Sequence, residues 1–188
     1  MTVTMLARTA RILVPAMVLA ACGAETPDEP VVSAAVTVEP RPEIYAEFEL
    51  TADLSHLGDR QREMIGVLIE ASKIMDDLYW RQAWGDDYKA RLASIDDTGT
   101  RRFAELNYGP WDRLADDSPF IKAVGPKPLG ANFYPPDMSK YEFEIAYLPG
   151  KKGLYSLVRR DNAGDLVLVP YHVAYKDELQ QAASLLRE

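Results

Sequence analysis

The longest stretch with helical periodicity in the sequence extends from about Asp59 to Trp84. Asp59 and Glu63 favour a helix start, and Gly85 follows the last periodic residue. Apolar side chains recur in this stretch at steps of three and four residues, at Met64, Leu68, Ala71, Met75 and Leu78, with Ile65, Val67, Ile74 and Tyr79 widening the stripe. The pattern predicts one long amphipathic helix.

Shorter helices are predicted after this one. One is expected over Asp87–Ile95 and another over Thr100–Leu106, which ends before the breaker sequence Asn-Tyr-Gly-Pro. Ser139 and Glu142 have the spacing of a capping box, which predicts a helix extending to about Tyr147.

A last amphipathic pattern begins near Tyr175, with Leu179, Ala182, Ala183 and Leu186 on one side. It continues to Glu188 with no glycine, proline or polar tail to end it. We therefore expect an element that a longer polypeptide would continue.

The segment between residues 109 and 136 differs from the rest of the chain because it contains six prolines. Proline lacks a backbone N–H, so this segment is predicted to be irregular. Its aromatic residues supply the apolar anchors that a flexible linker lacks, and they include Trp111, Phe120, Phe133 and Tyr134. An ordered loop is the expected structure.

Two β-prone runs follow, Leu154–Arg159 and Leu166–Tyr171, on either side of the turn sequence Asp-Asn-Ala-Gly-Asp. This arrangement predicts a β-hairpin. The expected fold class is α+β, mostly helical with one β-hairpin, over residues 43–188.

Residues 1–21 have the organisation of an export signal. Arg8 and Arg11 precede the apolar run Ile12–Ala21, which ends in small residues. This run is too short to cross a bilayer, which takes about 18 to 20 apolar residues.

The signal ends in Leu-Ala-Ala-Cys-Gly, which resembles the bacterial lipobox. That resemblance implies that Cys22 becomes the lipid-modified first residue of the mature protein. The alternative is a buried or reactive free thiol. Gly23 after the cysteine is similar to signals for the outer membrane, which predicts an exported, lipid-anchored protein on the periplasmic side of that membrane.

The segment 22–42 is rich in proline, alanine and glutamate and has no amphipathic period. It is predicted to be the lipidated cysteine followed by a flexible, semi-extended linker. Such a linker would hold the folded part away from the lipid surface.

The net charge of the chain argues against two kinds of binding partner. The formal net charge is -8. Arg8 and Arg11 are the only charges in residues 1–21, so removal of the signal makes it -10. Nucleic-acid binding depends on clustered basic residues and is not expected. An acidic protein is also repelled by anionic lipid, so membrane attachment must come from the lipid on Cys22.

Several runs of the sequence resemble the N-terminal part of bacterial enzymes related to dipeptidyl peptidase III, a zinc metallopeptidase. They occur in order from about residue 49 to the end of the chain. They include Ala52–Leu57, Leu68–Trp80, Arg101–Leu114, Gly130–Met138, Leu154–Arg160 and Val169–His172. The resemblance implies an incomplete lobe of a larger two-lobed enzyme that removes dipeptides from peptide N-termini.

The zinc site of that family is missing from this sequence. The resemblance implies a His-Glu-x-x-x-His helix and a further glutamate as ligands, and neither pattern occurs here. A catalytic zinc needs three protein ligands and an open position. His56 and His172 are the only two histidines and lie far apart in sequence. We therefore predict no catalytic residues, no metal ligands and no cofactor in this chain, and no peptidase activity by the chain alone.

Other chemically suggestive residues have simpler interpretations. His56 is expected to cap or pack at the start of the long helix. His172 is expected to be a hydrogen-bonded histidine at a strand end, with a contact in the substrate cleft as the alternative. Asp76, Asp77, Asp96 and Asp97 are expected to be solvated or helix-start charges, because adjacent helical residues point about 100° apart.

One cluster leaves two functions open. Tyr108, Trp111, Phe133 and Tyr134 either line a peptide groove or pack the irregular segment onto the helices. The first possibility corresponds to a non-catalytic lipoprotein that binds peptides or a partner protein. An in-frame continuation of the coding DNA with the His-Glu-x-x-x-His sequence would instead favour a truncated peptidase.

Overall fold

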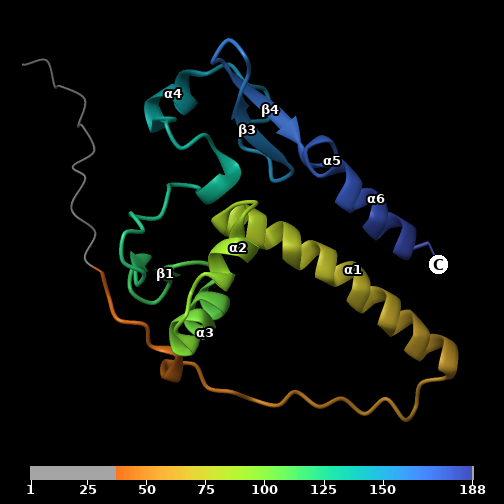
Figure 1. Ribbon diagram of the computed structural model, residues 1–188. Coiled ribbons are helices and arrows are strands. Elements are labelled where there is room, and N and C mark those ends of the chain that lie inside the picture. Colours follow the sequence, from red (N-terminus) through yellow and green to blue (C-terminus); the bar gives the residue numbers. More distant parts are fainter. Residues whose placement is uncertain (1–36, 188) are drawn as a thin grey trace, which may run out of the picture. The chain divides into compact units, whose positions relative to one another are not determined.

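The computed structural model describes residues 37–187 of the chain (Figure 1). The predicted export signal, Cys22 and most of the predicted linker lie outside these residues. The described part contains α1 (Asp59–Trp84), α2 (Tyr88–Ala93), α3 (Thr98–Asn107), α4 (Lys140–Ile145), α5 (Tyr171–Ala174), α6 (Lys176–Leu185), the 3-10 helices η1 (Pro42–Ile44) and η2 (Ala131–Phe133), and the strands β1 (Trp111–Asp112), β2 (Ser118–Pro119), β3 (Ser156–Arg160) and β4 (Leu166–Pro170). The predicted α+β class, mostly helical, is confirmed.

The long helix α1 begins and ends where the sequence predicts. At its start the backbone N–H of Gly58 donates to the side chain of Gln61 at 2.9 Å. At its end Gly85 has a φ of 117°, a conformation that side chains with a Cβ rarely adopt. The helix therefore ends at Trp84 without the backbone strain that a residue with a Cβ would introduce at position 85.

The single apolar stripe predicted for α1 is buried only in part. Ala71 and Leu78 are buried, whereas Met64, Leu68 and Met75 are 42 to 55% exposed. Trp80 and Trp84 are also buried, although they lie on the other side of the helix from Leu78. The second half of α1 is thus packed on two faces.

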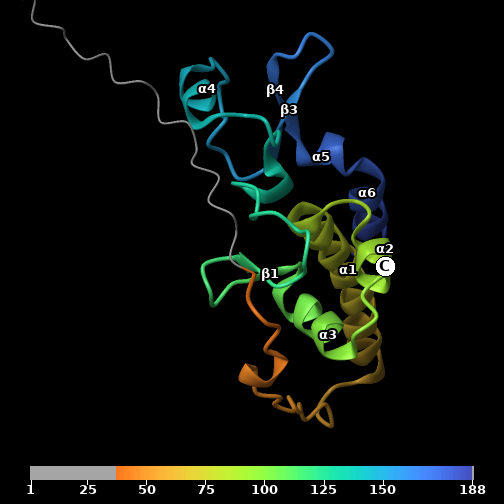
Figure 2. The ribbon, with the colours of Figure 1, turned by 60° about the vertical axis from the view of Figure 1, so that its left-hand side comes forward.

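Each face of α1 contacts a different part of the chain. Leu78 belongs to a cluster with Leu157 of β3 and Tyr175, next to α6. Figure 1 and Figure 2 both show α6 beside α1. On the other face, Trp80 and Trp84 pack with Tyr88 and Trp111.

The hairpin of β3 and β4 is antiparallel, with Val158 opposite Leu168. Leu157 and Val158 are 2% and 1% exposed, so the hairpin is held by its first strand. The predicted helix from about Tyr175 is confirmed as α6. The turn α5 between hairpin and helix was not predicted.

Two features of the proline-rich segment differ from the prediction of irregular structure. β1 and β2 form a second antiparallel ladder, and η2 adds a helical turn. The ladder is two residues long because Asp116 and Asp117 both have positive φ and turn the chain back. Phe120, after the ladder, packs on Phe103 of α3 with ring centres 4.6 Å apart. The segment is ordered, as its aromatic residues predict.

Residues 38–45 lie against this second ladder. The backbone N–H of Val38 donates to the carbonyl of Pro119 at 2.9 Å. Arg41 pairs with Asp112, and the hydroxyl of Tyr45 donates to Asn107 at 3.3 Å. The last residues of the predicted linker therefore contact the folded part. Among the helices of residues 37–187, none combines the length and apolar character that crossing a bilayer requires.

Candidate functional site

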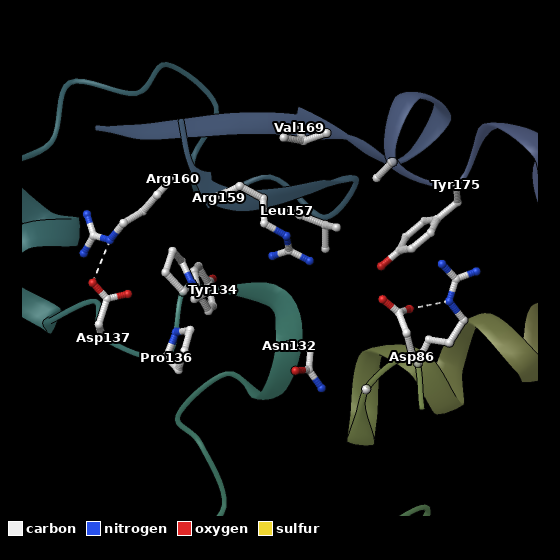
Figure 3. A pocket seen from close by; sticks show the side chains of 14 residues that line it. Asp86, Asn132, Tyr134, Pro136, Asp137, Leu157, Arg159, Arg160, Val169 and Tyr175 are labelled. Atoms are coloured by element: carbon white, nitrogen blue, oxygen red, sulfur yellow. Dashed lines mark hydrogen bonds and ion pairs between the residues drawn. The ribbon is translucent and has the colours of Figure 1, made fainter. Parts of the chain in front are cut away.

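A cavity of about 670 Å³ lies where the C-terminal end of α1, the η2 region and the β3–β4 hairpin meet (Figure 3). Its walls carry three arginines, Arg81, Arg159 and Arg160, and two aspartates, Asp86 and Asp137. Tyrosines, prolines and the aliphatic residues Leu157, Val169 and Ala174 supply the apolar part of the lining. The arginines differ in their partners, and this difference determines which of them is available to a ligand.

Arg81, at the α1 side, is held by two carboxylates. Its Nε donates to Asp86 at 2.7 Å, and its Nη1 forms a short hydrogen bond with Glu178 of α6. The hydrogen bond with Asp86 is the main reason why the pKa of Arg81 is raised, and Glu178 adds to it while burial opposes it. Arg81 therefore joins α1 to α6.

Arg160, at the opposite side, is also fully engaged. It donates to Asp137 at 2.7 Å and to both carboxylate oxygens of Glu142 at 2.7 and 2.9 Å. It also donates to the carbonyl of Gly164 in the hairpin turn at 2.8 Å. The pKa of Arg160 is raised, mainly by Glu142, and the pKa of Glu142 is lowered by the same contact. Arg160 therefore ties the hairpin to α4.

Arg159 lies between these two and has a different environment. Its Nη1 donates to the backbone carbonyls of Phe133 and Val158 at 3.2 and 2.8 Å. Within residues 37–187 no carboxylate comes within 4.0 Å of its side-chain nitrogens. Figure 3 shows its guanidinium directed into the cavity. Arg159 can thus donate hydrogen bonds to a bound carboxylate or peptide carbonyl.

Two tyrosines give the cavity an aromatic surface. Tyr175 is buried, and its hydroxyl accepts a hydrogen bond from Gln82 of α1 at 3.2 Å. Tyr134 packs edge-on against Phe143 with ring centres 5.5 Å apart. Gly130 permits this position, since a Cβ there would lie 2.3 Å from the Tyr134 ring.

The four aromatic residues predicted to act together are divided among separate places. Tyr108 and Trp111 pack with the α1 tryptophans, and Phe133 packs with Leu78 and Leu157. Tyr134 lines the cavity. Three of the four therefore pack the irregular segment onto the helices, whereas one remains a candidate for ligand contact.

The two histidines are exposed and do not lie in the cavity. His56 lies in the turn before α1. His172 lies in the helical turn α5, not at a strand end, because β4 stops at Pro170 and the chain turns there. Within residues 37–187 no three His, Cys, Asp or Glu side chains are grouped as a metal site would require. These residues do not fit a catalytic zinc, which needs three ligands.

Three of the four paired aspartates have hydrogen-bond partners. Asp97 caps α3 and accepts from the backbone N–H of Thr100 at 2.7 Å, as expected for a helix-start charge. Asp76 and Asp77 were expected to be solvated, but the hydroxyls of Tyr108 and Tyr88 donate to them, each at 2.7 Å. The two carboxylates fix the aromatic cluster on α1 from adjacent sides.

Arg159 is not among the residues that the sequence pattern predicts for a site. The sequence contained a signal, since Arg159 and Arg160 directly follow the buried residues Leu157 and Val158 at the end of β3. Which of the two is paired depends on Asp137 and Glu142, which lie 23 and 18 residues before Arg160. That information comes from the tertiary structure.

The chain is similar to two enzymes that have different names. No model of a protein family matches the chain. The sequence is similar to Nudix hydrolase 3 of Arabidopsis thaliana, with 25% identity over an alignment of 206 residues that covers 77% of this chain and 27% of that protein. The structure is similar to dipeptidyl-peptidase III from Corallococcus sp. strain EGB, with a TM-score of 0.67 and 35% identity over 76% of this chain.

Both relatives are much longer than this chain, which spans 27% of the first and 29% of the second. The match to the Corallococcus enzyme agrees with the resemblance found in the sequence. The two proteins are similar both in their α+β architecture and in their sequence over the matched part. In sequence and in fold, the described part of this chain is therefore similar to a part of a bacterial dipeptidyl-peptidase III.

Proposed function

We propose that this chain is a lipid-anchored polypeptide equivalent to the N-terminal part of a dipeptidyl peptidase III-like zinc metallopeptidase, inactive as a peptidase by itself. The observation that carries the proposal is the similarity to the Corallococcus enzyme, at 35% identity and a TM-score of 0.67. Identity and fold similarity over the same three quarters of the chain are more specific than fold similarity alone.

The proposed inactivity rests on the ligand set. Two exposed histidines on separate elements cannot supply the three ligands and the open position of a hydrolytic zinc. The purified mature chain, incubated with zinc and a chromogenic dipeptide substrate, is expected to release no product and to retain no zinc after gel filtration. Zinc-dependent release of dipeptides, or one tightly bound zinc per molecule, would contradict the proposal.

A chimaera tests the equivalence to the enzyme directly. Residues 43–188 would replace the matching part of the Corallococcus enzyme, whose remaining polypeptide stays unchanged. A chimaera that releases dipeptides is the expected result. A chimaera that folds, as judged by cooperative unfolding, but has no activity would show that these residues do not serve the same role.

The proposed anchor is the lipid on Cys22, on the periplasmic side of the outer membrane. It is supported by the short apolar run and the Leu-Ala-Ala-Cys sequence at its end. Cells grown with radiolabelled palmitate are expected to label the natural chain in the membrane fraction. Cys22→Ser is expected to abolish both labelling and membrane association, and a labelled Cys22→Ser variant would exclude this attachment site.

A second candidate function is a non-catalytic lipoprotein that binds peptides. The observation in its favour is the cavity in which Arg159 has no carboxylate partner among residues 37–187, beside Tyr134 and Tyr175. An arginine and aromatic rings are suited to a peptide carboxylate and its neighbouring side chains. Binding of a mixture of short peptides that Arg159→Ala abolishes, together with an inactive chimaera, would favour this function over the first.

A further inference from the structure

An amphipathic strand pattern occupies the segment between η1 and α1. From residue 46 to residue 54 the sequence is Ala-Glu-Phe-Glu-Leu-Thr-Ala-Asp-Leu, in which apolar and polar residues alternate throughout. Alternation over nine residues is the period of a β-strand with one buried face. Figure 1 shows this segment as an extended run below α1.

The face that such a strand would bury is open to solvent. All nine residues are exposed, and Phe48 and Leu50 are 82% and 90% exposed. In an extended backbone alternate side chains lie on the same side, so Phe48 and Leu50 share a face with Ala46, Ala52 and Leu54. An exposed apolar face of this kind marks an interaction site.

The backbone of the segment is equally open. Among residues 37–187, no hydrogen bond is made by a backbone N–H or carbonyl between Ala46 and Asp53. A cavity of about 950 Å³ lies beside its first half, toward Arg102 and Leu106 of α3. An unpaired, extended edge with room beside it is a template for another strand.

The polar face of the segment is acidic and defines what kind of strand would pair with it. Glu47, Glu49 and Asp53 alternate with the apolar residues. Arg102 lies 3.9 Å from Glu47, whereas Glu49 and Asp53 have no cation within 4.0 Å among residues 37–187. Pairing with a second copy of this segment would oppose carboxylates across the strands, which is unfavourable.

We propose that residues 46–54 form a β-strand that pairs with a strand of a protein partner in which apolar and basic residues alternate. The apolar residues of the partner would lie beside Phe48 and Leu50 on the same face, and its lysines or arginines would lie beside Glu47, Glu49 and Asp53 on the other face. Main-chain hydrogen bonds supply the attachment, and the acidic face selects a basic strand.

The test uses the mature chain with Cys22→Ser and a synthetic peptide of alternating lysine and valine. We expect the peptide to slow amide hydrogen exchange at residues 46–53 and not at the exposed turn around Asn162. A peptide of alternating glutamate and valine is expected to give no protection. Equal protection by both peptides, or none by either, would overturn the proposal.

Variants separate strand pairing from general adhesion. Leu50→Lys is expected to weaken binding of the lysine–valine peptide by about tenfold through lost cross-strand contact and added repulsion. Leu129→Lys is the matched control, since Leu129 is 95% exposed elsewhere on the surface. Leu50→Pro should abolish protection, because proline removes an N–H from the edge. Unchanged binding by both Leu50 variants would refute the pairing, and circular dichroism would verify that they remain folded.

Discussion

The guanidinium of Arg41 pairs with the carboxylate of Asp112, which lies 71 residues later in the chain and is fully buried. The same carboxylate accepts the backbone N–H of Leu114 at 2.9 Å. The hydrogen bond that Arg41 donates to Asp112 also raises the pKa of Arg41. One side chain thus fixes the turn after β1 and holds the segment around Arg41 against it.

Asp112→Ala is expected to destabilise the protein by about 1 to 3 kcal/mol, because it removes the buried partner of a half-exposed arginine and an acceptor for a backbone N–H. Urea unfolding followed by circular dichroism measures the change. Glu39→Ala is the control, since Glu39 is exposed two residues from Arg41. Equal midpoints for the two variants would show that the pair does not hold this segment.

Phe103 forms the centre of a second part of the core. Its side chain is fully buried and contacts the rings of Phe120 and Tyr45 at centre distances of 4.6 and 6.0 Å. Phe103→Ala is expected to cost about 3 to 5 kcal/mol of stability, because truncation leaves a cavity. Phe48→Ala offers a matched control, since Phe48 is 82% exposed and its truncation should change stability by less than about 0.5 kcal/mol. Similar losses for both variants would contradict this core.

The sequence alone predicts those elements whose start, end and periodicity depend on neighbouring residues in the chain. α1 was predicted at its observed limits, because its periodic apolar residues, acidic start and terminal glycine all lie within one stretch. The two-residue ladder of β1 and β2 is not predicted from the sequence, because its pairing depends on Asp116 and Asp117 adopting positive φ in a proline-rich loop. The partial burial of the α1 stripe was missed for a similar reason, since periodicity indicates which residues are apolar and not which neighbours cover them.

The same limit applies to the candidate site. The resemblance to dipeptidyl peptidase III came from runs of local sequence, and the structural comparison agrees with it. The cavity around Arg159 combines α1, η2 and the hairpin, which are separated by tens of residues. Only the tertiary structure shows that Arg160 is paired with carboxylates, whereas Arg159 donates only to backbone carbonyls among residues 37–187.

Asp77 gives the protein a predictable response to acid. Burial opposes ionisation of this carboxyl group, but hydrogen bonds from Lys89 and Tyr88 outweigh it and lower its pKa below the ordinary value of 3.8. A lowered pKa in the folded state means that the ionised group stabilises the fold above pH 3.8 and that this contribution is lost as pH falls through the folded-state pKa.

Asp77→Asn is therefore expected to be less stable than the natural chain by about 1 kcal/mol at pH 7, since a charged hydrogen-bond acceptor that is partly exposed is lost. The difference should shrink as the pH falls below 3.8 and through the lowered folded-state pKa of Asp77. Urea unfolding between pH 7 and pH 2 measures it. A difference that stays constant with pH would show that the carboxylate charge contributes nothing.

The adjacent arginines of β3 allow a final prediction in which one residue is the control for the other. Arg160 donates to Asp137, Glu142 and the Gly164 carbonyl, so it connects the hairpin to α4. Arg160→Ala should lower the melting temperature, because three acceptors lose their donor at once. Arg159→Ala removes a side chain whose described partners are two backbone carbonyls, and it should lower the melting temperature less. Differential scanning calorimetry of both variants measures the two decreases in melting temperature. A larger decrease for Arg159→Ala than for Arg160→Ala would mean that Arg159 supports the fold and is not available to a ligand. The cavity would then lack the donor on which the proposed peptide binding depends.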